Sequence, residues 1–210
     1  MRTTPREVNF VLEKIQKNVL IGTLLGDGAV KYRGKECRLH IKHSANQLPL
    51  VNYKRKVFRN ITRMKVRKFK QKVGEKDYVF AEFVTFTNPE FTKYRNLFYP
   101  SGKKIVPKNI KQLLVDPLSL AVWFMDDGSA EYAGASLQTH CFTESGVKRL
   151  MSCLKLNFKI KTTKRLNKGK WIIYFPKASM SRLRKATERY MLKEFMYKLK
   201  PYSIRKSLTP

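Results

Sequence analysis

The chain has 210 residues, 42% of them hydrophobic, and its 45 Lys and Arg against 15 Asp and Glu give a formal charge of +30. The length and hydrophobic content are typical of a folded protein with one large or two small packed parts, and they exclude a disordered basic tail. Charge repulsion of this size disfavours a compact state unless a polyanion is the partner. Because the cations run through the whole chain rather than along one amphipathic helix, nucleic acid is favoured over a membrane.

The cysteines and the apolar runs give the expected compartment. Cys37, Cys141 and Cys153 are odd in number and lack paired spacing, so we expect no disulfide framework and a reducing environment. The longest apolar run, Ala121 to Met125, is far too short to span a membrane, and the amino terminus shows no secretory apolar region. We therefore expect a protein that works where it is made, in an organellar matrix or stroma or a bacterial cytoplasm.

In the first half, apolar residues at helical spacing predict a helix from about residue 8 to Asp27, where Gly28 ends it. A strand at about 35–43, a helix at about 46–62 and a hairpin of 66–73 with 78–87 follow.

The second half repeats this succession. Asp116 as N-cap and Pro117 in the first turn predict the start of a helix that ends at Asp127, before Gly128. A strand at about 135–142, a helix at about 144–156, a hairpin of 157–166 with 170–175 and a final helix at about 179–196 follow. The hairpin turn is predicted at Asn167-Lys168-Gly169.

The two succession patterns indicate an internal duplication. Leu20–Gly28 and Leu120–Gly128 are both apolar, end in Asp-Gly and lie 100 residues apart, and the same offset places His40 opposite His140. We expect an α+β fold of two pseudo-symmetric halves, 1–100 and 116–210, joined by 101–115, with the duplicated helices at the central interface. Gly22 and Gly26, four residues apart on one helix face, would let the two helix backbones approach closely.

The repeated Asp-Gly ends predict a metal site. A carboxylate at the negative end of a helix dipole is unfavourable, yet both predicted helices end in one, Asp27 in the first and Asp127 in the second. If the helices pack side by side, these carboxylates converge and need a proton or a metal between them. Oxygen-ligated magnesium fits, because it completes its shell with water and phosphate and supports phosphodiester hydrolysis. We favour Asp127 over Asp126 because Asp127 aligns with Asp27, and we interpret Asp126 as a solvated neighbour that lends only its backbone.

Several predicted strands alternate basic and apolar residues, which indicates sheets with helices behind and DNA in front. Lys68, Lys70 and Lys72 alternate with Phe69 and Val73, for example, and Gln138 and His140 are expected in the places that match the first-half strand. Such a ribbon fits the major groove, although most of its lysines should contact phosphates. The candidate DNA contacts are Arg38, His40, Lys42, Lys68, Lys70, Lys72, Gln138, His140, Lys159, Lys161, Arg165 and Lys170.

Leu20–Gly28 and Leu120–Gly128 resemble the paired LAGLIDADG motifs of a homing endonuclease family, and the second is similar to that of the monomeric, yeast mitochondrial-intron branch. Lys103–Asn109 and Phe195–Leu199 resemble the same branch. The first motif departs from the consensus at Thr23, Leu25 and Gly26, and the second lacks a glycine at Val122, but both Asp-Gly ends are intact.

The resemblance implies a monomer with an αββαββα plan in each half, whose saddle-shaped antiparallel sheets lie on double-stranded DNA. It implies a double-strand break at a long, asymmetric site and intron mobility. Two or three Mg²⁺ ions would be held by Asp27 and Asp127, with the carbonyls of Gly26 and Asp126 as further ligands. Lys104 and Lys198 would be the basic residues beside the metals.

Two alternatives stay open on the same fold. One is an RNA maturase that binds intron RNA and assists splicing, and the other is a non-catalytic DNA-binding regulator. The intact Asp27, Asp127 and Lys198 favour the nuclease, because pure nucleic-acid binders need no metal site.

Overall fold

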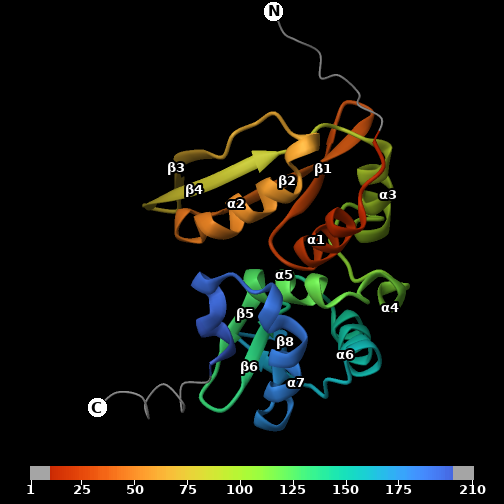
Figure 1. The fold of residues 1–210 in the computed structure, drawn as a ribbon, viewed down its shortest axis with the longest axis vertical. Helices are drawn as coiled ribbons and strands as arrows, with labels where there is room; N and C mark the ends of the chain where they lie inside the picture. Colours follow the sequence, from red (N-terminus) through yellow and green to blue (C-terminus); the bar gives the residue numbers. More distant parts are fainter. Residues whose placement is uncertain (1–9, 201–210) are drawn as a thin grey trace, which may run out of the picture.

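The structure is a computed structural model that describes residues 10–200. Each half runs helix, two strands, helix, two strands, helix, so the predicted αββαββα plan is confirmed (Figure 1). The first half comprises α1 (Lys14–Leu25), β1 (Ala29–Arg33), β2 (Glu36–Ser44), α2 (Leu48–Val57), β3 (Arg67–Val73), β4 (Lys76–Val84) and α3 (Pro89–Phe98). The second comprises α5 (Pro117–Asp127), β5 (Gly128–Ala130), β6 (Ala135–Gln138), α6 (Glu144–Phe158), β7 (Thr163–Asn167), β8 (Lys170–Phe175) and α7 (Lys177–Thr187).

Short helical segments complete the described chain. They are α4 (Ile110–Leu113) in the connection and the 3₁₀ segments η1 (Ala45–Gln47), η2 (Arg59–Ile61), η3 (Glu188–Tyr190) and η4 (Lys193–Leu199). None of the helices between residues 10 and 200 combines the length and apolar character that a membrane span requires.

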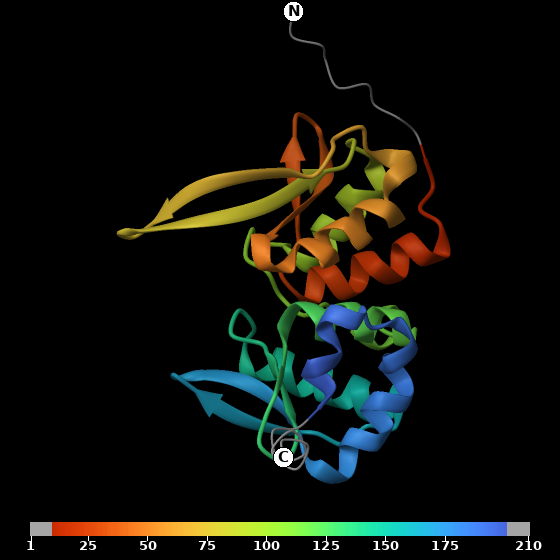
Figure 2. The same ribbon diagram turned by 60° about the vertical axis from the view of Figure 1, so that its left-hand side comes forward.

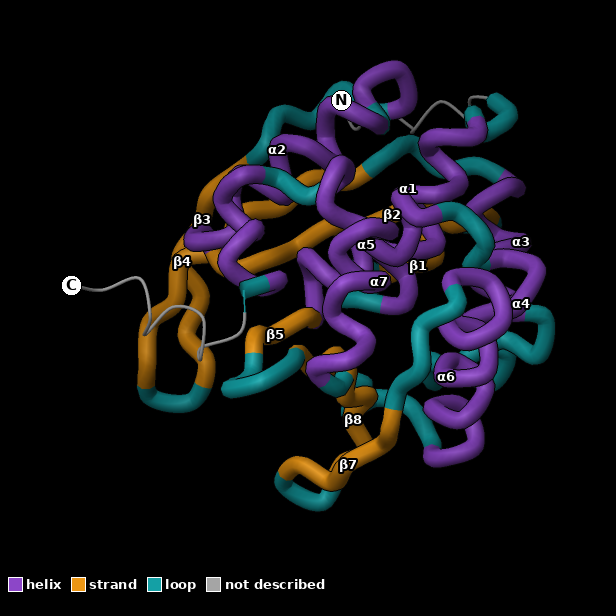
Figure 3. Tube along the Cα trace, turned by 60° about the horizontal axis from the view of Figure 1, so that its bottom comes forward, coloured by secondary structure: helices purple, strands orange, loops and turns teal. Residues whose placement is uncertain are grey.

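Each half forms a four-stranded antiparallel sheet, in the orders β1-β2-β4-β3 and β5-β6-β8-β7. The outer hairpins β3–β4 and β7–β8 project to the same side of the molecule in Figure 2. Figure 3 shows the helices gathered on the other side, behind the sheets. One face of each sheet is therefore left without helices, and we call it the open face.

Helices α1 and α5 cross at the interface between the halves, as the duplicated motif predicts. A Cβ built on Gly22 would lie 2.3 Å from the carbonyl oxygen of Ser119, and one on Gly26 would lie 2.4 Å from Oδ2 of Asp126. These distances leave no room for a side chain. The predicted role of both glycines in close helix approach is confirmed.

The predicted hairpin turn is confirmed, since Lys168 and Gly169 both have positive φ (49° and 72°) and join β7 directly to β8. Two positive φ values in a two-residue turn match the right-handed twist of the flanking strands. Asp116 also caps α5 as predicted, with its side chain accepting a hydrogen bond from the Leu118 N–H.

Other boundaries differ from the prediction. The family resemblance implies the short strands β1 and β5, but the local sequence patterns do not predict them, because they begin within two residues of the glycine that ends the preceding helix. Helix α3, capped by Asn88, was missed between the hairpin and the connection. The start predicted near residue 8 lies outside the described residues, and α1 begins at Lys14. At the other end, α7 stops at Thr187 and the chain continues in 3₁₀ segments.

The strand predicted from residue 157 is wrong over its first part. Helix α6 continues to Phe158, Lys159 ends it in a left-handed conformation (φ 58°), and β7 begins only at Thr163. A left-handed residue at a helix end is usually glycine, so a lysine there gives no sequence signal.

Candidate metal centre and nucleic-acid interface

The two motif carboxylates lie at the ends of the crossing helices and have unequal environments. Burial, followed by the negative charges of Asp27 and Asp126, raises the pKa of Asp127 to about 8, against the positive charges of Lys104 and Lys198. Asp27 has a half-exposed side chain, and its partial burial acts to raise its pKa, but the interaction with His43 and the charges of Lys54 and Lys104 outweigh this and lower that pKa below its ordinary value. The structure therefore brings the carboxylates close enough to be electrostatically coupled, with Asp127 short of positive charge.

Lys104 and Lys198 occupy equivalent places at the two helix ends. Nζ of Lys104 donates to the carbonyls of Gly26 (2.7 Å) and Gly28 (3.0 Å). Nζ of Lys198 donates to the carbonyls of Met125 (2.5 Å) and Asp126 (3.3 Å). Burial lowers the pKa of both lysines.

The oxygens predicted as extra metal ligands, the carbonyls of Gly26 and Asp126, thus already hold cations, namely these ammonium groups. With the two carboxylates they form a set of hard oxygen donors, which suits Mg²⁺. Among residues 10–200, no group of three or more His, Cys, Asp or Glu side chains forms a metal site. Carbonyls, water and a DNA phosphate would therefore have to complete the shell.

The interpretation of Asp126 as a solvated neighbour is wrong. Its side chain is fully buried and accepts hydrogen bonds at 2.7 and 2.8 Å from Nζ of Lys54, which is also fully buried. The same Nζ lies 3.2 Å from Nε2 of His43. Sequence reasoning missed Lys54 because it begins the basic run Lys54-Arg55-Lys56, which reads as a solvated helix face.

The open face of the first sheet carries part of the predicted basic set. Cys37, Leu39, Ile41 and His43 of β2 are buried under the helices, while Arg38, His40 and Lys42 between them are partly exposed. Nε2 of His40 lies 2.9 Å from Oε2 of Glu82, which also pairs with Arg67. His40 is therefore held in a polar network rather than free.

Lys68, Lys70 and Lys72 lie on the opposite face from the one predicted. Lys68 is paired with Ala81, which is also the partner of His43, so these lysines share the helix side of the sheet. They are exposed because the hairpin extends beyond the helices, and Val79, which pairs with Lys70 on the same face, is exposed too (42%). Alternation predicts burial only where something covers the strand.

The open side of the same strand presents Arg67, Phe69 and Gln71 instead. Lys42 donates to Oε1 of Gln71 and lies over the Phe80 ring, 4.1 Å from its centroid. Arg67 and Gln71 were missed as candidates, and the register that places them could have been found by counting back from the turn at Gly74.

In the second sheet, Gln138, Arg165 and Lys170 share the open face, since Gln138 and Arg165 both pair with Ile172. The guanidinium of Arg165 stacks on the Tyr174 ring, 3.2 Å from its centroid. Lys159 and Lys161 were predicted to lie on this face, but they do not. They follow α6, and their carbonyls accept hydrogen bonds from Arg182 and Ser179 of α7.

The predicted equivalence of His40 and His140 is also wrong. His40 pairs with Ala29, and the corresponding pair in the second sheet is Ser129 with Ser136. Because the second hairpin is shorter, His40 matches Ser136 and His140 lies beyond the end of β6.

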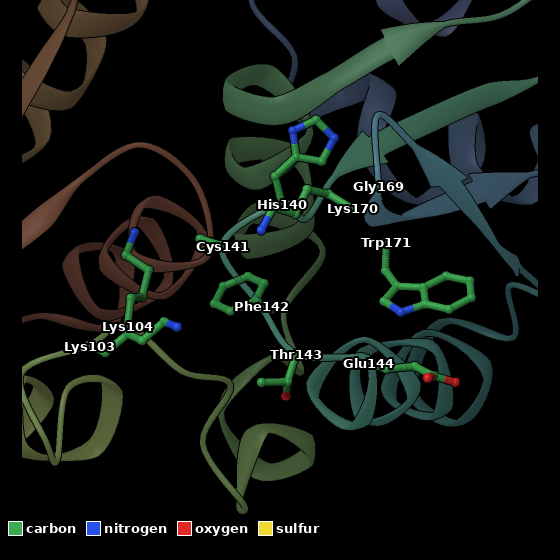
Figure 4. Close-up of a pocket in the computed structure, with 10 residues that line it drawn as sticks. All are labelled: Lys103, Lys104, His140, Cys141, Phe142, Thr143, Glu144, Gly169, Lys170 and Trp171. Atoms are coloured by element: carbon green, nitrogen blue, oxygen red, sulfur yellow. The ribbon is translucent and has the colours of Figure 1, made fainter.

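His140 instead lines a pocket of about 430 Å³ beside Lys104. Figure 4 shows Lys104 reaching from this pocket toward the first half, while Trp171 lies on its other side. Three lysines, Lys103, Lys104 and Lys170, line it together with His140. The pocket is therefore a basic depression next to the end of α1.

Residues 17–183 match the family model of the LAGLIDADG DNA endonuclease family. The chain belongs to this family. It is 38% identical over 143 residues to the intron-encoded endonuclease ai4 of Dictyostelium discoideum, covering 67% of this chain and 89% of that protein. It is 29% identical over 202 residues to the cytochrome b mRNA maturase bI2 of Debaryomyces hansenii, covering 92% of this chain and 77% of that protein.

Solved structures agree with this assignment. The homing endonuclease I-WcaI bound to its DNA recognition sequence superposes with a TM-score of 0.85 at 27% identity, over 91% of this chain and 88% of that one. I-DmoI in complex with DNA and Mn, at 12% identity and a TM-score of 0.54 over 85% of this chain and 98% of that one, shows the shared fold. The family resemblance and fold class predicted from the sequence are confirmed.

Proposed function

We propose that this chain is a site-specific homing endonuclease that makes a double-strand break in a long, asymmetric DNA target and promotes mobility of its host intron. The observation that carries the proposal is the meeting of two acidic helix ends, Asp27 and Asp127, at the crossing of α1 and α5 with a lysine on each. Membership of a DNA endonuclease family supports it.

Asp27 and Asp127, with the carbonyls of Gly26 and Asp126, would hold two or three Mg²⁺ ions. Bound divalent ions supply an activated water and stabilise the leaving oxygen in phosphodiester hydrolysis. Lys104 would stabilise the charge that develops on the scissile phosphate, and Lys198 would orient the attacking water. Both lysines already lie beside the carboxylates, where burial lowers their pKa.

We propose that a monomer binds duplex DNA along both open faces, with residues 1–100 and 116–210 each reading one half of the target across the connection 101–115. The two hairpins that project to the same side support this arrangement (Figure 2). Six of the DNA contacts predicted from the sequence lie on the open faces. They are Arg38, His40 and Lys42 in the first half and Gln138, Arg165 and Lys170 in the second. His140 and Lys170 would meet the backbone at the basic pocket (Figure 4).

The deciding experiment is cleavage of a pooled library of long duplexes that includes intron-less ribosomal RNA genes and organellar gene junctions. It is run with Mg²⁺, with Ca²⁺, and with the Asp27→Asn/Asp127→Asn variant. Magnesium-dependent double-strand cuts at one long sequence, absent in the variant, are expected. Cuts that persist in the variant would show that the two aspartates are not required for cleavage.

A maturase is the second candidate, favoured by the similarity to the maturase bI2 over most of the chain. If the protein binds every duplex in the pool without cutting, binding and splicing of candidate intron RNAs become the deciding assays. A splicing stimulation that survives the double aspartate variant would show that the RNA function does not use the metal site.

Neighbouring residues on opposite faces of β3 give a matched test of the DNA interface. Lys70→Ala should weaken all duplexes alike and reduce the slope of log affinity against log salt by about one at most, because a lysine on the helix side of the hairpin is expected to contact phosphates rather than bases. Gln71→Ala should leave that slope unchanged but lose about 1–3 kcal/mol on the target alone, because a neutral amide reads base edges. Equilibrium binding at several salt concentrations measures both. A sequence-selective loss in Lys70→Ala would place DNA on the helix side of the hairpin.

A further inference from the structure

Three fully buried side chains form a chain of polar contacts that ends at Asp27. The side chains of His43, Lys54 and Asp126 are 0% exposed. Lys54 comes from α2 of the first half and Asp126 from α5 of the second, so their pair crosses the interface between the halves. His43, the penultimate residue of β2, lies between Lys54 and Asp27.

The contacts of Lys54 favour one tautomer of His43. An ammonium group has three N–H donors and no acceptor. Nζ of Lys54 lies 2.7 and 2.8 Å from the two carboxylate oxygens of Asp126 and 3.2 Å from Nε2 of His43. Oδ1 of Asp126 lies farther from Nε2, at 3.7 Å, which is beyond hydrogen-bond distance. Because the nearest polar group to Nε2 is therefore a donor, Nε2 accepts, and in the neutral imidazole the single proton is on Nδ1.

That Nδ1–H is directed at the metal centre. Nδ1 of His43 lies 3.5 Å from Oδ2 of Asp27 and has no nearer hydrogen-bond partner in the described chain. The distance is longer than an ordinary N–H···O bond. However, the Asp27 side chain is 49% exposed, so it has room to rotate. A small rotation would shorten the distance from Nδ1 to Oδ2 by the few tenths of an ångström that an ordinary hydrogen bond requires.

The second half has no equivalent donor on its strand. The registers that match His40 with Ser136 also match His43 with Thr139. Oγ1 of Thr139 donates to the carbonyl of Trp171 at 2.7 Å, away from Asp127. The pseudo-symmetry of the two carboxylates is therefore broken by one buried imidazole.

We propose that His43 is a positioning residue that donates its Nδ1–H to Asp27, and that the Lys54–Asp126 pair sets its tautomer. One oxygen of Asp27 is then fixed and the other is left for the metal, whereas Asp127 is not held in this way. Because Lys54 and Asp126 belong to different halves, correct docking of the halves and the orientation of Asp27 are one event. The metal part of this proposal rests on the proposed function, but the tautomer does not.

The tautomer is tested on the metal-free protein by NMR with ¹⁵N-labelled histidine, since the two neutral forms differ in their ring nitrogen shifts. The chain has three histidines, so loss of one resonance set in His43→Asn assigns His43. Wild type should show a neutral ring protonated on Nδ1. Lys54→Met/Asp126→Leu, which removes the pair without leaving a buried charge, should lower the share of the ring that is protonated on Nδ1, because only Asp27 then favours that form. An unchanged ring would show that Asp27 rather than the pair sets the tautomer. A wild-type ring protonated on Nε2, or on both nitrogens, would overturn the proposal.

The positioning role is tested by Mn²⁺ titration followed by electron paramagnetic resonance. His43→Leu cannot donate to Asp27 and should weaken one Mn²⁺ site by about tenfold, the scale of lost outer-shell partners. His43→Asn, whose amide N–H can replace Nδ1–H, should stay within about threefold of wild type on the same scale. Thr139→Val, at the matching position of the second half, is the control and should leave Mn²⁺ affinity unchanged.

The outcomes separate this inference from the proposed function. Equal losses in His43→Asn and His43→Leu, or no loss in either, would reduce His43 to a packing role while leaving the endonuclease intact. If wild type binds no Mn²⁺, the proposed metal chemistry fails and the positioning role falls with it, while the NMR result still decides the tautomer.

Discussion

We expect Asp127→Asn to abolish DNA cleavage and to leave DNA binding in place. The substitution keeps the shape of the side chain and removes a proposed metal ligand. We expect the rate of strand cutting to fall on the order of a thousandfold or more, because bound metal ions contribute several kcal/mol of transition-state stabilisation. Single-turnover cleavage and equilibrium binding of the same duplex in Ca²⁺ measure the two effects separately.

The same variant should stabilise the metal-free fold. Burial and nearby negative charge raise the pKa of Asp127 to about 8, so above that pH the folded state holds a charge that the unfolded state accommodates better. Asp127→Asn should therefore raise the free energy of unfolding in chelator at pH 9, measured by urea denaturation.

Asp27→Asn is the matched comparison. Its pKa is lowered in the folded state, so its charge contributes stability that is present above its ordinary pKa and is lost as the pH falls through the lower folded value. Asp27→Asn should abolish cutting as well but should lower the free energy of unfolding at pH 9. If both variants destabilise the fold equally, the electrostatic inequality of the two sites is wrong.

The duplicated motif made much of this architecture predictable. Two apolar helices ending in Asp-Gly, each followed by β-rich and helical segments, implied two similar halves and a central helix pair, and Gly22 and Gly26 do lie where the backbones cross. These features were predictable because they depend on local sequence, namely caps, turn residues and small residues at helical spacing.

The faces of the projecting hairpin were not predictable from alternation. In β2, Leu39 and Ile41 alternate with polar residues because helices cover the face of the sheet on which these two side chains lie. In β3 the lysines alternate just as regularly, but no helix covers the distal strand, so its hydrophobic residues mark cross-strand contacts such as Phe69 with Phe80 rather than a core. Only the register with β4 and β2 separates these cases.

The buried part of the candidate site was the least predictable. Asp126 looked like a spare acid beside Asp127, and Lys54 like one of many surface lysines. Their contact joins residues 72 positions apart and from different halves, and it forms only when α1 and α5 cross. A sequence pattern reports which residues a helix presents, but not which charge from another element will meet them.

Lys54→Met should destabilise the protein by about 3–5 kcal/mol, the cost of leaving one member of a buried ion pair without its partner. The carboxylate of Asp126 would remain fully buried, and in the described structure no other Lys or Arg lies within hydrogen-bond distance of it, while Nε2 of His43 is 3.7 Å away. Urea denaturation monitored by circular dichroism measures the loss. Lys54→Met/Asp126→Leu should recover most of it, because two apolar side chains fill the site without an uncompensated charge.

The Lys54→Met/Asp126→Leu variant would also show what the pair contributes. Recovered stability together with reduced Mn²⁺ affinity would mean that the pair is retained for orienting His43 and Asp27 rather than for holding the halves together. Recovered stability with unchanged Mn²⁺ affinity would leave the pair a packing feature. A loss below about 1 kcal/mol in Lys54→Met would contradict the buried geometry itself, since only exposed pairs are worth so little.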